Sequence, residues 1–183
     1  NIDLEIPFKR MTYEVAFSNY GSDKPDLRFD LGIKEITELF KDTELKFLRA
    51  ILDKQGRIGA VPVYDKEFTR SELDSIVAKA QQLGAKGLLW IRCKDGAIES
   101  PVANFLPADF LKQIQAVLPN FKNGSTLFII AGEYKEAWTL LGRVRLELAA
   151  LLSVIPQNEF NFTWITDFPL FEYDKDAKRW DAA

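Results

Sequence analysis

The sequence predicts an α+β fold built on a two-layer antiparallel sheet with helices on one face. Three observations predict it: apolar runs of strand length, two segments of helical periodicity between them, and tight turns that join neighbouring runs. They give the order β-β-α-β-β-α, followed by a further strand, a long C-terminal helix and a hairpin. In such a fold each helix buries one face against the sheet.

The first two strands are expected at residues 45–50 and 57–63. Leu45 and Phe47 alternate with charged or smaller neighbours, and an apolar run resumes after the polar stretch 53–56. Two such runs joined by a polar connection are typical of a β-hairpin with a long turn.

The first helix of this domain is expected from Thr69 to Gly84. Thr69 and Glu72 have the spacing of a capping box, in which each side chain accepts a hydrogen bond from the other residue's backbone amide. The apolar residues that follow recur on one helical face. Gly84 can adopt the left-handed conformation that ends a helix.

The rest of the domain is predicted from turn and proline signals. A strand at 87–93 is followed by the turn Lys94-Asp95-Gly96 and a shorter strand at 97–100. A second helix begins after Pro107 and ends at Pro119, since proline cannot continue a helix. Another strand is expected at 126–130.

The two ends of the chain flank this domain, which gives the division 1–41, 42–133 and 134–183. A short helix is expected over 12–20, with Gly21 as its stop, and the clearest helix of the chain over 134–155. A strand at 162–166 then precedes a hairpin over 173–180, whose turn is Asp174-Lys175-Asp176.

The composition excludes several kinds of chemistry. The chain has 24 basic and 27 acidic residues, a net charge of −3, and no His, so a Ser-His-Asp triad, a Cys-His pair and a His-containing metal site are excluded within it. The single cysteine, Cys93, excludes an internal disulfide, and we expect its side chain to be buried or half-buried in its strand. No segment has the apolar length of a membrane span, and the N-terminus lacks a signal-peptide pattern, so we expect a cytoplasmic protein with no membrane partner.

The polar motifs predict no catalytic, cofactor-binding or metal-binding residue. An acidic group that could bind a divalent cation consists of Asp167, Glu172, Asp174 and Asp176. Its segment Asp174-Lys175-Asp176 is similar to the start of a calcium loop, but the glycine and terminal glutamate of such a loop do not follow at the required spacing. The sequence therefore favours a solvated hairpin turn. Arg143 and Arg145 lie two positions apart on a helix and therefore point to different faces, which argues against a phosphate clamp.

Four segments resemble one family in the right order along almost the whole chain. They are MTY at 11–13 with YGSDKPDLRF at 20–29, GAKGLLWI at 84–91, LLGRVRL at 140–146, and FTWITDFPLFEYD at 162–174. The first and last resemble the bacterial-type aspartyl-tRNA synthetases. The second resembles the GAD domain that this family inserts into its class II catalytic domain, and the third resembles the helix that leads out of that insertion.

The resemblance implies a fragment: a GAD insertion domain with catalytic-domain flanks. The parent would activate aspartate with ATP and Mg²⁺ and transfer it to tRNA, but the family's ATP-binding arginine and its His-His-Pro-Phe segment would lie outside this sequence. We therefore expect no activity and no cofactor in the fragment, and only a position near the parent's active site for Asp167 and Glu172. The remainder of the synthetase would be its partner, with a homodimeric parent and a monomeric fragment.

Two alternatives and one open question remain at this stage. Residues 85–91 alone would also fit the GAD module of a tRNA-dependent amidotransferase, and the fold would fit a free-standing α+β interaction domain. A contact with tRNA would be electrostatic and sensitive to salt. It would use basic groups of residues 42–133, a region with one more basic than acidic side chain, such as Arg49, Arg57 and Arg92.

Overall fold

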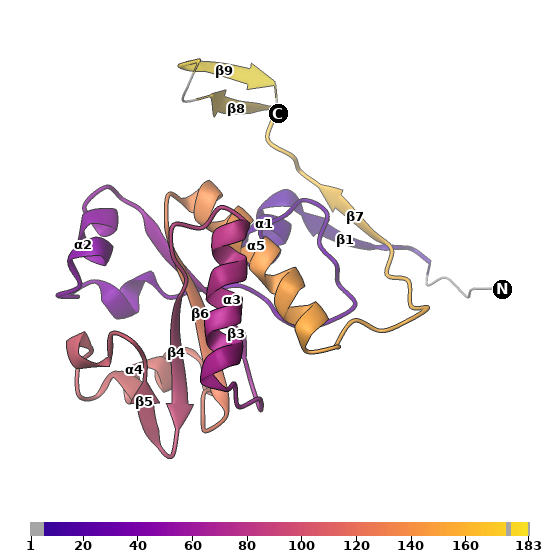
Figure 1. The fold of residues 1–183 in the computed structure, drawn as a ribbon. Coiled ribbons are helices and arrows are strands. Elements are labelled where there is room, and N and C mark those ends of the chain that lie inside the picture. Colours follow the sequence, from indigo (N-terminus) through magenta and orange to yellow (C-terminus); the bar gives the residue numbers. More distant parts are fainter. Residues whose placement is uncertain (1–5, 175–176, 183) are drawn as a thin grey trace.

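A five-stranded antiparallel sheet forms the centre of the computed structural model, which describes residues 6–174 and 177–182 (Figure 1). The strand order is β2-β3-β6-β4-β5. The strands are β2 (Lys34–Glu35), β3 (Arg57–Val63), β4 (Leu89–Lys94), β5 (Ala97–Glu99) and β6 (Ser125–Gly132). Each neighbouring pair is antiparallel, which confirms the α+β class expected from the sequence.

Both faces of this sheet are buried, so the fold has three layers. Along β6, Phe128 and Ile130 join one apolar cluster, whereas Leu127 and Ile129 join another. The first cluster is covered by α3 (Arg70–Gln82) and α5 (Tyr134–Leu151), and the second by α2 (Lys46–Leu52) and α4 (Phe110–Val117). The expectation of helices on one face is therefore wrong. The continuous apolar runs of β3 and β6 explain the difference, because a strand with one exposed face alternates with polar residues.

The strand expected at residues 45–50 is instead helix α2, and the hairpin predicted with 57–63 is wrong. Leu45, Leu48 and Leu52 are three or four positions apart, so a helix places all three toward the sheet. Phe47, which a strand would have buried beside Leu45, is 51% exposed. The edge beside β3 is occupied by β2 (Figure 1).

The other elements expected between residues 57 and 155 are confirmed, with shifts of a few residues at their ends. Helix α3 begins at a capping box in which Thr69 and Glu72 each bond the other's backbone amide. Gly84 follows it with a φ of +101°. Helix α4 ends before Pro119, and a one-turn 3-10 helix, η2 (Ala103–Phe105), precedes it. A similar turn, η1 (Thr37–Phe40), packs beside α2.

The outer ends of the two flanks pair with each other outside the central sheet, whereas β2 of the flank 1–41 belongs to that sheet. Strand β1 (Lys9–Thr12) runs parallel to β7 (Thr163–Thr166), and α1 (Tyr13–Tyr20) ends at Gly21 with a φ of +65°. The hairpin β8 (Phe171–Asp174) and β9 (Arg179–Ala182) lies apart from the sheet at the end of the chain that leaves β7 (Figure 1). This confirms the helix, strand and hairpin expected here, but Lys175 and Asp176 of the predicted turn lie outside the described residues. No helix among the described residues is long and apolar enough to cross a membrane.

Candidate functional site

The three arginines considered for tRNA contact lie far apart. In the ladder of β6, Arg57 pairs with Gly132 and Arg92 pairs with Thr126, six residues away, or about 20 Å at the rise of a strand. Arg49 lies on α2, in the layer that covers the second cluster. The fold therefore does not gather these side chains into one basic patch.

Each of these arginines also has partners within the chain. Arg49 donates to the carbonyls of Lys41 and Thr43 at 3.0 and 2.9 Å, which closes the turn before α2. Arg57 forms an ion pair with Glu35 at 3.3 Å, and its guanidinium lies 4.6 Å from the centre of the Tyr134 ring. Arg49 and Arg57 remain exposed to solvent.

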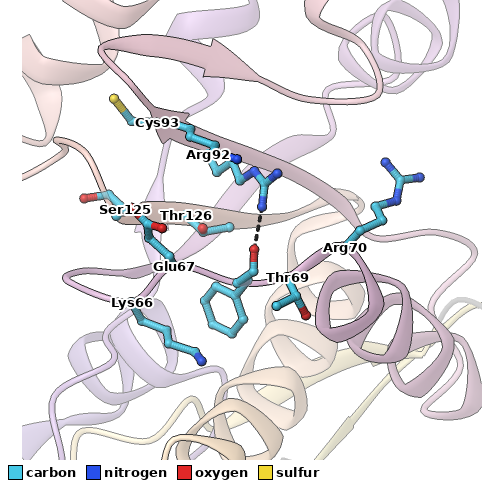
Figure 2. A pocket seen from close by; sticks show the side chains of 11 residues that line it. Lys66, Glu67, Thr69, Arg70, Arg92, Cys93, Ser125 and Thr126 are labelled. Carbon is cyan, nitrogen blue, oxygen red and sulfur yellow. Dashed lines mark hydrogen bonds between the residues drawn. The ribbon is translucent and has the colours of Figure 1, made fainter.

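Arg92 is the most buried of the three and lines a cleft at one end of the central sheet. Its Nε and Nη2 donate to the Glu99 carboxylate at 2.7–3.0 Å, and its Nη1 donates to the carbonyl of Phe68 (Figure 2). The hydrogen bonds from Arg92 hold the pKa of the Glu99 carboxyl below its ordinary value. Arg92 thus fastens β5 and the segment before α3 to β4.

The cleft has a volume of about 280 Å³ and is bordered by residues 66–70, the end of β4 and the start of β6 (Figure 2). Its charged lining residues are Lys66, Glu67, Arg70, Arg92 and Lys94. Three of these cations have acidic partners: Lys66 with Glu72, Arg70 with Asp74, and Arg92 with Glu99. These ion pairs reduce the positive field that the lining residues present to an anion.

Cys93 is 3% exposed, which confirms the expectation that it is buried. Burial raises the pKa of its thiol. Its Sγ lies 3.4 Å from Oδ1 of Asn123, which also accepts a hydrogen bond from the Gly96 amide at 2.8 Å. Asn123 therefore joins the turn after β4 to the segment before β6.

The structure gives Asp167 and Glu172 different partners. Asp167 has a φ of +57°, and its carboxylate accepts a hydrogen bond from the Thr166 hydroxyl at 3.0 Å. Glu172, on β8, forms an ion pair with Lys135 in the first turn of α5. The two carboxylates thus stabilise a turn and an inter-element contact, respectively.

Tyr13 lies beside the contact between Glu172 and Lys135. Burial raises the pKa of the Tyr13 phenol, and the Glu172 carboxylate adds to this shift while Lys135 opposes it. The Tyr13 ring packs against Phe168 and Phe17, with centroid distances of 5.3 and 5.8 Å. This cluster connects the segment after β7 with α1 and α5.

Arg145 is a buried residue whose role the sequence did not predict. It is 1% exposed, and it donates to the carbonyls of Leu31, Asp26 and Phe29 at 3.0, 2.7 and 3.1 Å. Burial lowers the pKa of its guanidinium, while Tyr20 and the carboxylates of Asp26 and Asp30 oppose the shift.

A signal for this burial was present in the sequence. Arg145 lies four positions after Leu141 and three before Leu148, on the apolar face of its helix. Arg143, by contrast, is exposed, as expected from the spacing of the two arginines.

Two glycines allow α1 and α5 to approach each other closely. A Cβ at Gly142 would lie 2.5 Å from the carbonyl oxygen of Tyr20, and a Cβ at Gly21 would lie 1.9 Å from that of Trp138. The indole of Trp138 donates to the carbonyl of Ser18 at 2.8 Å. Helix α5 therefore packs against both the central sheet and the N-terminal flank.

The described residues do not fit a metal centre. Within residues 6–174 and 177–182, no three His, Cys, Asp or Glu side chains are placed to hold a metal ion together. What the arrangement provides is a three-layer scaffold with a partly neutralised polar cleft.

Comparison with known proteins shows which family and which relatives this chain is similar to. The family model described as the GAD domain matches residues 47–141, which include the first part of α5. An aspartate–tRNA(Asp/Asn) ligase from Thermodesulfovibrio yellowstonii is 42% identical over 179 residues, covering 97% of this chain and 30% of that protein. Ligases of the same name from Persephonella marina and Dictyoglomus turgidum are 38% and 39% identical, over 97% and 98% of this chain and 30% of each protein.

The chain thus spans about 30% of the length of the curated relatives that it matches. Its similarity to them extends through both flanks of the GAD match. The chain belongs to the GAD domain family.

Proposed function

We propose that this chain is the GAD insertion module of an aspartate–tRNA ligase, together with the adjoining pieces of its catalytic domain. The observation that carries the proposal is that similarity to such ligases covers 97–100% of the chain at 36–42% identity. A GAD module of a tRNA-dependent amidotransferase, or a free-standing interaction domain, would account for residues 47–141 and leave the similarity of the flanks unexplained.

The flanks support the division into an insertion at 42–133 and catalytic-domain pieces at 1–41 and 134–183. Strands β1 and β7 form a parallel pair, an arrangement that is normally part of a larger sheet buried on both faces. Trp164, Phe171 and Trp180 are 61%, 61% and 68% exposed. Large aromatic side chains gathered on one segment are typical of a surface that another part of the protein covers, and we assign that role to the remainder of the ligase.

The parent reaction joins the aspartate carboxylate to the α-phosphate of ATP and releases pyrophosphate, and it then transfers the aspartyl group from AMP to a tRNA hydroxyl and releases AMP. We assign ATP and Mg²⁺ to the parent ligase as a whole. Asp167 and Glu172 shape the segments near the parent's active site. The ion pair of Glu172 with Lys135 and the left-handed turn at Asp167 support this structural role.

The test is aspartate-dependent exchange of pyrophosphate into ATP by the longer protein that contains these residues. We expect exchange with aspartate but not with glutamate or asparagine, and none by residues 1–183 alone. An absence of aspartate-dependent exchange by the longer protein, or exchange by the chain alone, would contradict the proposal.

Positioning of tRNA is the second candidate role, favoured by the four cations that line the cleft, Lys66, Arg70, Arg92 and Lys94. Labelled tRNA, including the aspartate and asparagine acceptors, would be titrated at low and at moderate salt. We expect affinity that falls as salt rises and falls further in Arg92→Gln, the only one of the three predicted contacts that lines the cleft. Arg49→Gln and Arg57→Gln test the two predicted contacts outside it, and exposed Arg143→Gln is the control. An absence of tRNA binding at low salt would contradict this second role and would favour a purely structural role for the module within the ligase.

The assembly and location of the parent complete the proposal. We assign a homodimeric, cytoplasmic parent and a monomeric fragment. Light scattering on the isolated chain should give the mass of one chain, and the mass of a dimer would refute the assignment of a monomer.

A further inference from the structure

Arg145 connects the helix that leaves the insertion with the N-terminal flank. Residues 21–33 form no helix or strand, so their backbone groups have no regular ladder of hydrogen bonds. Three of their carbonyls, at Asp26, Phe29 and Leu31, instead point at the single guanidinium of Arg145. Because three carbonyls of one irregular segment accept hydrogen bonds from the same guanidinium, we expect Arg145 to determine the conformation of that segment.

The surroundings of the guanidinium make it difficult to replace. Its Cζ lies 4.0 Å from the centre of the Phe29 ring and 4.8 Å from that of Tyr20, so two aromatic rings lie against it. A guanidinium has five N–H donors in a fixed plane, whereas a lysine ammonium is a compact donor on a flexible stem. Lysine at this position would keep the charge but could not reach all three carbonyls in the same geometry.

We propose that Arg145 is a positioning residue that fixes segment 21–31 relative to α5. This is the segment that carries the GSDKPDLRF motif. The same helix packs on the central sheet through Trp138 and Leu141, both of which contact the site of Gly59 on β3. Through Arg145, the insertion and this flank of the catalytic domain are held as one rigid unit rather than as two bodies joined by linkers.

The catalytic consequence of this positioning rests on the proposed function, but the positioning itself does not. The first arm of the test is therefore backbone amide hydrogen exchange on the 183-residue chain, with no substrate present. The variants are Arg145→Lys, which keeps the charge, and Arg145→Met, which removes it. Arg143→Met is the matched control, since Arg143 lies on the same helix and is exposed.

We expect amides of residues 22–33 to exchange at least about 10-fold faster in Arg145→Lys than in the wild type, and faster still in Arg145→Met. Amides of β3 and β6 should accelerate less than those of 22–33, because they report the loss of global stability alone. In Arg143→Met all amides should keep their wild-type rates, apart from those beside Leu83, whose carbonyl accepts a hydrogen bond from Arg143 at 3.4 Å. Unchanged exchange over 22–33 in Arg145→Lys would overturn the proposal. Equal acceleration of the sheet and of 22–33 would overturn it too, because the residue would then act on stability alone.

The second arm uses the longer protein and aspartate-dependent pyrophosphate exchange, at a temperature where Arg145→Lys is fully folded. We expect kcat/KM for aspartate to fall by about 10-fold or more in Arg145→Lys and to stay at the wild-type value in Arg143→Met. Wild-type kinetics in Arg145→Lys would overturn the catalytic consequence. A wild-type protein without exchange would refute the proposed function, and the hydrogen-exchange arm would still decide the positioning.

Discussion

Gly142 offers a sharp test of the close packing between α1 and α5. A Cβ at this position would lie 2.5 Å from the carbonyl oxygen of Tyr20 and 3.0 Å from that of Gly21. Both atoms belong to backbone, so neither can rotate away as the end of a side chain could. The substitution Gly142→Ala must therefore push the end of α1 away from α5.

The magnitude follows from two opposing effects. Overpacking a well-packed interface lowers the free energy of unfolding by about 1–3 kcal/mol. Replacing glycine by alanine inside a helix raises it by about 1 kcal/mol, because alanine has the higher helix propensity. Because both contacted atoms are backbone, the overpacking cost here falls in the upper half of its range, about 2–3 kcal/mol, so the net expectation is a loss of about 1–2 kcal/mol in the free energy of unfolding. For a chain of this length, that loss lowers the Tm by about 2–8 °C.

The assay is thermal unfolding followed by far-UV circular dichroism, with Gly87→Ala as the control. A Cβ at Gly87 would meet nothing within 4 Å, so this variant should keep or slightly raise the Tm. A Tm for Gly142→Ala at or above the wild-type value would refute the argument that α1 and α5 touch through backbone at this point.

Three further predictions concern single side chains. Thr69→Ala removes the cap of α3 and should cost about 1 kcal/mol, which urea unfolding at neutral pH would measure. The hydrogen bonds of Glu72 with the Thr69 backbone and with Lys66 lower the pKa of its carboxyl from 4.5 to about 2. Because the unfolded state then takes up the proton first, Glu72 stabilises the fold above pH 4.5 and loses this effect as the pH falls to about 2. Urea midpoints across that window should fall less steeply in Glu72→Gln than in the wild type, and equal slopes would contradict the assignment. Cys93, buried and with a raised thiol pKa, should react with a thiol reagent much more slowly in the folded chain than in urea. Equal labelling rates would show that it is accessible.

The elements predicted best from the sequence are those whose signals are local. The start of helix α3 is predicted by Thr69 and Glu72 and its end by Gly84, and the structure confirms the role of all three residues. Helix α2 was missed because a run as short as residues 45–52 satisfies both a strand and a helical pattern. Only the apolar cluster under Leu48 decides between them.

Features that depend on distant parts of the chain could not be predicted. Nothing near Lys9 indicates a parallel pairing with Thr163, and nothing in 57–63 alone shows that both faces of β3 are covered. The role of Arg145 could be predicted only in part. Its place on the apolar face of α5 was visible, but its acceptors lie more than 110 residues earlier in the chain.

The central claim is that these 183 residues are part of an aspartate–tRNA ligase whose reactive centre lies outside them. The most direct measurement is the attachment of labelled aspartate to tRNA, compared between the longer protein and the chain alone, each with ATP and Mg²⁺. We predict that the longer protein charges tRNA with aspartate and that residues 1–183 charge none. Charging by the chain alone, or a longer protein that attaches no aspartate, would contradict the claim.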